Sequence, residues 1–304
     1  MNIVFENINF NSHSGPNSFA RKLKHQLVNR NNSVKDMISA DFKPDVQLSF
    51  ISSNIKLAPI IQRLDGIYFN TDQDYDSLNS PIERTYDNAS AIIFQSDFNK
   101  SLIEHWFGVH ENAFVIRNGS DIDFISKIEP MQEDAIDKFE NIWSCSSSWR
   151  PHKRLGENIR YFLEFSKDND CLIIAGENPD VAVSHPRVFY AGHLSYDSLI
   201  SLYKRSKYFL HLAWLDHCPN VVIDARAAGA HVICSSSGGT SEIAGKNSTI
   251  IEEDEWDFSP IRLYSPPSLD FSKKHTGLYE SHIDMSTVCD QYVEVFSEVI
   301  RNNK

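Results

Sequence analysis

The sequence predicts an α/β protein built from two Rossmann-like domains. Short β-rich runs alternate with helical patterns along all 304 residues, which is typical of parallel sheets covered by helices. Several strands are continuous apolar runs, such as LIIA and YFLHLAW, as expected for strands buried on both faces. About six strands fall in each half, and one open sheet of that total is too wide for this length, so we expect two domains.

The predicted elements follow one another in strand–helix order. The strands are 2–8, 34–38, 46–51, 59–64, 91–94 and 113–116, then 142–146, 171–175, 188–191, 208–212, 231–234 and 248–251. Apolar residues at helical spacing predict helices over 17–29, 98–107, 155–165, 198–206, 220–228 and 286–300. Ser96 or Asp97 is the expected cap of the second helix, and Gly229 is the expected end of the fifth.

The domain boundary is expected just after the Asn-Gly-Ser at 118–120. The first domain is predicted over 1–122, the second over 123–280, and a C-terminal helix over 281–304 that crosses back to the first domain. A cleft is expected between the two domains, and 121–137, which is acidic and poor in strand signals, is the expected hinge. A second acidic run, EEDEWD at 252–257, predicts a solvated loop.

Composition excludes several classes of protein. Lys and Arg number 29 against 41 Asp and Glu, a net charge of −12, so nucleic acid is not an expected partner. No run approaches the roughly 20 apolar residues that cross a bilayer, and the N-terminus lacks the basic region of a signal peptide. Five scattered cysteines predict reduced, mostly buried thiols in a cytoplasmic protein. No G-x-G-x-x-G follows a strand and no P-loop motif occurs, which disfavours a classical dehydrogenase or a P-loop kinase.

The loops that follow strands are the expected ligand sites of an open α/β sheet. The loop SSSWRPHKRL brings Arg150, Lys153 and Arg154 to one strand-to-helix turn. Cations at a helix N-terminus oppose the helix dipole, so a solvated helix start explains them less well than a diphosphate that they neutralise.

Two carboxylates lie around the next helix, with seven residues between them. Asp216 precedes the helix and Asp224 lies within its first two turns, where carboxylates could accept hydrogen bonds from sugar or ribose hydroxyls. Taken alone, the pair could equally be a capping acid and a helix-start acid. His211 and His217 flank Asp216, but no further ligands at metal spacing accompany them, so a metal site is not expected.

Two glycine-containing turns complete the set of loops. Gly238, Gly239 and Thr240 follow a strand, and Thr240 is the expected cap of a short helix. Gly192 and His193 follow another strand, where a plain turn is the alternative.

The order of these motifs resembles glycosyltransferase family 4, retaining enzymes with the two-domain GT-B fold. The similarity is strongest in the segment YFLHLAWLDHCPNVVIDARAAGAHVICSSSGGTSEIAG, which is similar to the donor domain of that family, including its E-x7-E motif. WRPHKRL looks like the Arg…Lys diphosphate site, and AIIFQSDFNKSLIEHWFGV resembles part of the segment that closes the N-terminal domain. The resemblance runs to about residue 250 and is thin before residue 90.

The resemblance implies a role for individual residues. The implied catalytic residues are Arg150, Lys153 and Asp216; the implied donor-binding residues are Gly15, Gly192, His193, Asn220, Val221, Asp224, Gly238, Gly239 and Thr240; the weak acceptor-side candidates are Arg63 and Asp65. Gly15 would lie over the donor across the cleft. Both acids are Asp where the family has Glu, and Ser148 stands where the family has its arginine, so Arg150 would act from a shifted position.

The implied reaction is transfer of a sugar from a nucleotide-diphosphate sugar to a hydroxyl acceptor, with retention of configuration. A UDP-sugar is favoured over a GDP-sugar, no metal is expected, and the acceptor is a glycan, a lipid-linked sugar or a small molecule. Arg21, Lys22, Lys24, Arg30 and Lys35 make the segment 16–35 basic and free of acids. That segment could contact a membrane surface peripherally at the inner face or be a solvated helix face. Two other functions stay open: a sugar-nucleotide 2-epimerase of the same fold, and a non-catalytic nucleotide- or glycan-binding subunit.

Overall fold

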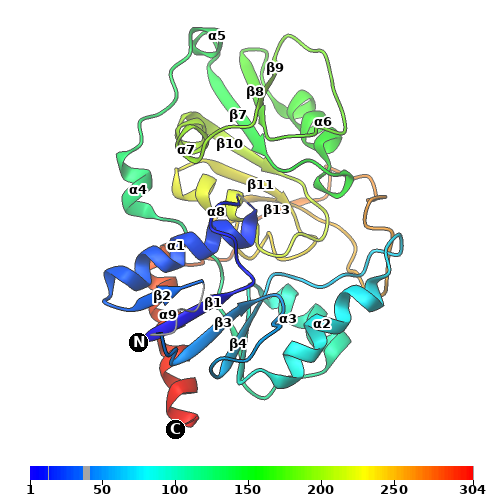
Figure 1. Ribbon diagram of the computed structural model, residues 1–304. Helices are drawn as coiled ribbons and strands as arrows, with labels where there is room; N and C mark the ends of the chain where they lie inside the picture. The colour runs from blue at the N-terminus through cyan, green and yellow to red at the C-terminus, as the bar shows by residue number, and fades with distance from the viewer. Residues whose placement is uncertain (13, 37–41, 304) are drawn as a thin grey trace. The chain divides into compact units, whose positions relative to one another are not determined.

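The chain consists of two compact units, each built on one sheet (Figure 1). The computed structural model describes residues 1–12, 14–36 and 42–303. Unit 1 comprises Met1–Asp121, Phe258–Ile261 and His282–Lys304, and unit 2 comprises Ile122–Asp257 and Arg262–Ser281. The predicted two-domain α/β fold is confirmed. Residues 37 and 38 of the predicted strand 34–38 lie outside the described residues.

Unit 1 contains a six-stranded sheet in which every neighbouring pair is parallel. The strand order is β2-β1-β3-β4-β5-β6. Its strands are β1 (Asn2–Glu6), β2 (Ser33–Lys35), β3 (Val46–Phe50), β4 (Ile60–Leu64), β5 (Ala91–Phe94) and β6 (Ala113–Val115). β3, β4 and β5 are buried at every position, as their continuous apolar runs predict.

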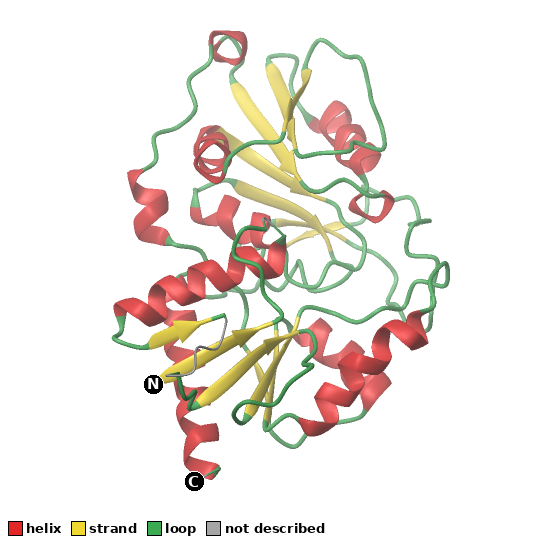
Figure 2. Cartoon of the chain, in the orientation of Figure 1, coloured by secondary structure: helices red, strands yellow, loops and turns green. Residues whose placement is uncertain are grey.

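Four helices pack on this sheet, and Figure 2 shows them in red. They are α1 (Gly15–Asn29), α2 (Tyr75–Asn88), α3 (Asp97–Phe107) and α9 (Met285–Asn302). α1 and α9 share one core with β1, β3, β4 and β5, whereas α2 and α3 contact β4 and β5. α3 begins where Ser96 accepts a hydrogen bond from the Asn99 amide, and it ends at Gly108, whose φ of 84° favours glycine.

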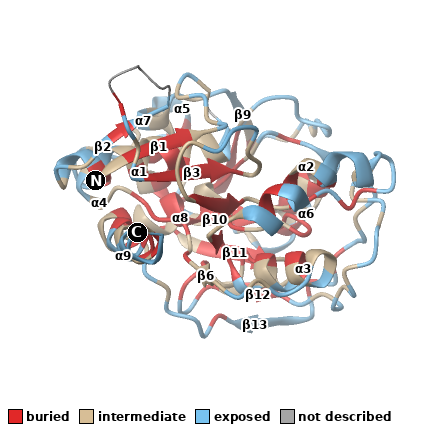
Figure 3. Cartoon of the chain, turned by 60° about the horizontal axis from the view of Figure 1, so that its bottom comes forward, coloured by how far each residue is buried: buried red, intermediate tan, exposed pale blue. Residues whose placement is uncertain are grey.

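Unit 2 contains a seven-stranded sheet with one antiparallel edge. The strand order is β13-β12-β11-β10-β7-β8-β9, and only β13 runs antiparallel to its neighbour. The strands are β7 (Asn141–Ser146), β8 (Asp170–Ala175), β9 (Val188–Gly192), β10 (Ser206–His211), β11 (His231–Ser235), β12 (Thr249–Ile251) and β13 (Lys274–Thr276). Figure 3 shows most strands buried and the outer faces of the helices exposed.

Helices cover both faces of the second sheet. They are α4 (Ile122–Lys127), α5 (Asp134–Asp137), α6 (Leu155–Phe165), α7 (Tyr196–Arg205) and α8 (Asn220–Ala227), with a 3₁₀ turn η1 (Pro151–Lys153) before α6. α6 buries Leu155, Ile159 and Phe162 in a core with β7, β8 and β10, because that spacing places the three on one helix face. α7 and α8 contact each other and β10.

Long-range contacts join chain segments in ways that the sequence pattern did not predict. Residues 258–261, inside the predicted second domain, pack with unit 1, where Trp106 Nε1 donates to the Phe258 carbonyl over 2.9 Å. α9 also belongs to unit 1, as the predicted crossing back requires. α2, α4, α5 and β13 were not predicted, and no helix of the described ranges is long and apolar enough to cross a membrane.

Candidate functional site

Three of the loops predicted to bind the donor, those after β7, β10 and β11, meet at the carboxyl ends of the unit 2 strands, where the strand order reverses. The chain runs from β7 outward through β8 to β9 and returns on the other side of β7 with β10. Ligands of open α/β sheets bind at such a switch point, outside the carboxyl ends of the strands. The loops after β7 and β10 carry Lys153 and Asp216, so this topology brings the two residues together.

Lys153 and Asp216 form an ion pair. Lys153 Nζ donates to Asp216 Oδ2 over 2.5 Å, and the two side chains are 18% and 14% exposed. His211, the last residue of β10, places Nε2 2.9 Å from the same oxygen. The backbone N–H of His217 donates to Asp216 Oδ1 over 3.1 Å. The Asp216 carboxylate therefore contacts a cation, an imidazole and a backbone amide.

Electrostatics keep this carboxylate ionised and the nearby imidazoles neutral. Burial raises the pKa of Asp216, but the Lys153 charge and the His211 hydrogen bond outweigh it, so the pKa lies well below its usual value. Burial lowers the pKa of His211, and Asp216 only partly offsets that effect. Burial also lowers the pKa of His217 to about 4 and of His152 to about 3. Near pH 7 the lysine is thus the cationic side chain beside Asp216.

The backbone is strained next to both partners of the ion pair. Arg154, which follows Lys153, has φ 51°, and Leu215, which precedes Asp216, has φ 56°. Left-handed backbone costs non-glycine residues about 1–2 kcal/mol each, so the surrounding contacts must hold it. The Leu215 amide donates to Ser237 Oγ over 3.2 Å, and Trp214 N–H donates to the His152 carbonyl over 2.7 Å. The loops after β7, β10 and β11 therefore fix one another.

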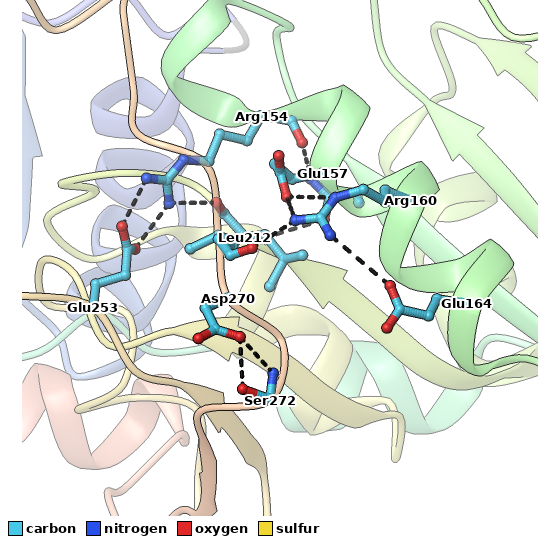
Figure 4. A network of polar contacts seen from close by, with 10 residues as sticks. Arg154, Glu157, Arg160, Glu164, Leu212, Glu253, Asp270 and Ser272 are labelled. Carbon is cyan, nitrogen blue, oxygen red and sulfur yellow. Dashed lines mark hydrogen bonds and ion pairs between the residues drawn. The ribbon is translucent and has the colours of Figure 1, made fainter.

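The three cations predicted for the loop after β7 have different surroundings. Lys153 pairs with Asp216, and Arg150 is exposed just before η1. Arg154 is 3% exposed and its guanidinium binds Glu253 bidentately, over 2.8 and 2.7 Å (Figure 4). The prediction of a solvated loop over 252–257 is wrong at Glu253, whose side chain is 8% exposed because it neutralises Arg154.

The helix α8 carries the second acid of the pair. Asn220 and Val221 form the first turn of α8, and Asp224 lies in the second turn, as predicted. Asp224 is 4% exposed, and its charge contributes to the raised pKa of Tyr203, which burial dominates. Pro219 precedes the helix without a side-chain cap, so neither acid is its N-cap.

The glycine turn after β11 is tied to Asp216. Gly238 has φ 82° and pairs with Asp216 as an isolated parallel bridge, and the Gly239 amide donates to the Asp216 carbonyl over 2.8 Å. A Cβ on Gly238 would lie 2.4 Å from that carbonyl, so only glycine fits. Thr240 is fully buried, and a turn follows it where a short helix was predicted. Gly192 ends β9 and, like His193, is exposed.

In unit 1 the acceptor-side candidates belong to a buried polar network. Arg63 is 1% exposed and binds Asp65, the Asn118 side chain at 2.6 Å and the Tyr292 hydroxyl at 3.1 Å. Its guanidinium also lies 4.0 Å from the centre of the Phe19 ring. These contacts give Arg63 a structural role that joins β4 to α9. Gly15 begins α1, and its place in donor binding stays a prediction.

The basic segment 16–35 coincides with α1 and β2, and several of its cations have partners within unit 1. Arg21 donates to the carbonyls of Phe10 and Ser12. Arg30 binds Ser286 and Asp290 of α9, over 2.7 and 2.9 Å. Arg21 and Arg30 therefore have protein partners that explain their presence without a membrane. Membrane contact of the segment stays a prediction.

Metal ligands do not gather in the described part of the chain. No cluster of three or more His, Cys, Asp or Glu side chains with metal-binding placement occurs among the described residues. Within the acidic stretch 72–76, Asp74 caps α2 by accepting from the Ser77 amide, which gives it a structural role. The five cysteines are buried thiols outside any disulfide, as predicted.

His211 is the site residue that sequence reasoning did not assign. His211 precedes Asp216 by five residues in the sequence, and this spacing by itself suggests only a metal ligand. The signal that could have found it is a single imidazole inside the apolar run YFLHLAW, since a buried polar group needs a partner.

Part of the chain that carries this site matches a known family. Residues 126–257 match the family described as "Glycosyl transferases group 1", a range that includes Lys153, Asp216 and Asp224. No curated protein matches the sequence of the chain.

Solved structures resemble the whole chain at low sequence identity. A sucrose-phosphate synthase from Thermosynechococcus elongatus has a TM-score of 0.71 at 11% identity, covering 99% of both chains. Anabaena Alr3699/HepE in complex with UDP and glucose has a TM-score of 0.66 at 14% identity, covering 98% of this chain and 100% of the other. A glycosyltransferase from Rickettsia africae ESF-5 has a TM-score of 0.60 at 14% identity, covering 99% of each. These similarities show the fold, which is the two-domain GT-B fold of glycosyltransferases.

Proposed function

We propose that this protein is a glycosyltransferase that moves a sugar from a nucleotide-diphosphate sugar to a hydroxyl acceptor. We further propose that it retains the anomeric configuration, as family 4 enzymes do. The observation that carries the proposal is the Lys153–Asp216 pair at the switch point of unit 2, within the range that matches group 1 glycosyl transferases.

The proposed sugar transfer requires stabilisation of the leaving diphosphate. The bond from the anomeric carbon to the phosphate oxygen breaks, the diphosphate gains negative charge, and the acceptor oxygen bonds to the same carbon on the same face. The acceptor proton passes to the leaving phosphate. Lys153 carries three N–H donors, so it can hold Asp216 and a phosphate oxygen together, and the exposed Arg150 is a second cation in the same loop.

The two carboxylates have separate tasks in this proposal. Asp216 accepts hydrogen bonds from the donor sugar, since its low pKa keeps it an acceptor near pH 7. Asp224 accepts from the ribose hydroxyls, and the amides of Asn220 and Val221 at the start of α8 face the phosphates. Gly192, His193, Gly238, Gly239 and Thr240 stay proposed donor contacts, and Asp65 stays a proposed acceptor-side residue.

A uridine nucleotide is the proposed donor. The Anabaena protein of similar fold is described in complex with UDP-glucose, which supports this choice. The test is a calorimetric panel of UDP-, GDP-, ADP- and TDP-sugars, followed by a transfer assay with the sugar nucleotide that binds. We expect saturable binding of one base and release of its nucleotide diphosphate.

Lys153→Ala makes the test specific to the site. Because the diphosphate charge grows toward the transition state, this variant should lose turnover by at least about tenfold while donor affinity changes less. Lys207→Ala, which removes an exposed lysine at the start of β10, should behave like the wild type. Binding of none of the sugar nucleotides would contradict the proposal. Conversion of the donor to its 2-epimer without an acceptor would favour the epimerase instead.

A further inference from the structure

His211 is a polar side chain at the end of the buried half of β10. β10 continues through Phe209 and Leu210 to His211, which is 4% exposed, and the imidazole stacks on the Phe209 ring. Burial of an imidazole is unfavourable unless its polar atoms find partners. An aliphatic residue would fill this position at no such cost, so the hydrogen bond to Asp216 is the feature that only the histidine supplies.

The partner fixes the protonation state of the ring. Asp216 is ionised and can only accept, so His211 Nε2 must carry the hydrogen that it donates across 2.9 Å. Burial lowers the pKa of His211, so the ring is neutral near pH 7 and Nδ1 carries no hydrogen. His211 is therefore a neutral, directed donor rather than a second cation.

A count of lone pairs indicates what this donor achieves. A carboxylate offers about four acceptor positions. Among the described residues, Oδ2 of Asp216 accepts from Lys153 and His211, and Oδ1 accepts from the His217 amide. One position on Oδ1 is left. With two donors on Oδ2, the carboxylate cannot rotate, so this last position has a fixed direction.

We propose that His211 is a positioning residue, which holds Asp216 so that Oδ1 presents its remaining acceptor position to a hydroxyl of the donor sugar. The inference rests on the proposed function and adds a residue to its machinery. When the diphosphate draws the Lys153 ammonium toward a phosphate oxygen, His211 keeps Oδ2 in place, because its ring is anchored in the strand and does not follow the ligand.

The test uses two replacements of His211 and a matched control in the full-length protein. His211→Leu removes the donor but fills the apolar site, whereas His211→Gln keeps an N–H near the position of Nε2. His231→Leu is the control, since His231 begins β11 in the same sheet and binds Thr249 Oγ1 over 2.9 Å. We expect kcat to fall roughly tenfold in His211→Leu and to recover mostly in His211→Gln, because hydrogen bonds to charged groups are the strong ones.

Binding measurements separate positioning from folding. UDP affinity and stoichiometry by calorimetry should stay within about twofold of the wild type in His211→Leu, since UDP carries no sugar for Asp216 to hold. A wild-type kcat in His211→Leu would overturn the inference, as would a loss in His211→Leu that His211→Gln does not restore.

The imidazole tautomer provides a readout that needs no turnover. Long-range proton–nitrogen NMR should find His211 as the Nε2–H tautomer, with a hydrogen-bonded proton shift that disappears in Asp216→Asn. If no sugar nucleotide is turned over by the wild type, the proposed function fails, and this tautomer and its coupling to Asp216 still support the positioning contact. An Nδ1–H tautomer in an active wild type would overturn the contact and leave the proposed function standing.

Discussion

Replacing Arg154 with alanine should destabilise unit 2 strongly without removing the proposed nucleotide site. The side chains of Arg154 and Glu253 are 1% and 8% exposed, and two hydrogen bonds of 2.8 and 2.7 Å join them. Removing one partner of such a buried pair costs about 3–5 kcal/mol, because the other charge stays buried without compensation. At about 2–4 °C per kcal/mol for a unit of this size, the unfolding midpoint should fall by roughly 6–20 °C.

Two companion variants check the origin of this loss. Arg154→Gly removes the same ion pair but relieves the left-handed backbone at φ 51°, so it should be about 1–2 kcal/mol less destabilising than Arg154→Ala. Arg154→Met combined with Glu253→Leu removes both charges, and its stability should lie close to the wild type or above it. Urea unfolding followed by tryptophan fluorescence measures all three.

Arg150 and Arg154 should differ in their effects on ligand binding. Folded Arg154→Ala should bind the nucleotide diphosphate as the wild type does, because the guanidinium that the substitution removes contacts Glu253. Wild-type stability of Arg154→Ala combined with lost nucleotide binding would refute this reasoning. It would also reassign the diphosphate contact from Arg150 to Arg154.

Three further predictions test the charges of the site. Asp224→Asn should weaken nucleotide diphosphate binding about tenfold by calorimetry, because hydrogen bonds to a charged acceptor contribute about 1.5–3 kcal/mol; unchanged affinity would leave Asp224 a structural role. Acidification from pH 7.5 to 5.5 should cost about 1.4 kcal/mol through His152, whose pKa burial lowers to about 3, since the unfolded chain takes up the proton first; His152→Gln should remove this part of the slope in urea unfolding and leave the part due to His217, whose pKa burial also lowers. Excess EDTA should leave transfer unchanged, and loss restored by Mn²⁺ would implicate the acids of 72–76.

The sequence predicted the strands well because buried parallel strands read as continuous apolar runs. Every predicted strand has a counterpart, although several ends differ by one to three residues. α2 was not predicted because its sequence is polar and contains Pro81. β13 is short and exposed at all three positions, so no apolar pattern marks it. Local pattern thus identified the elements that carry an apolar run or an apolar helix face and missed those that carry neither.

Sequence reasoning missed remote partners that no strand end marks. Arg154 and Glu253 are 99 residues apart, and nothing local distinguishes Glu253 from its acidic neighbours. The Phe258 carbonyl accepts a hydrogen bond from Trp106, 152 residues away in the chain, and no change in composition marks this contact. Lys153 and Asp216 could be proposed together because each lies in a loop directly after a strand, and parallel topology brings such loops together.

The strained turn at Arg154 explains why two adjacent cations have such different partners. In regular helical backbone, consecutive side chains lie about 100° apart around one axis. The left-handed φ of 51° instead interrupts the helical backbone between η1 and α6, and there Lys153 pairs with Asp216 while Arg154 pairs with Glu253. The left-handed residue costs about 1–2 kcal/mol, and the contacts of the buried Arg154–Glu253 pair hold it in place. Arg154 is thereby coupled to Lys153 through the backbone. Arg154→Gly should therefore loosen Lys153, even though it destabilises unit 2 less than Arg154→Ala does.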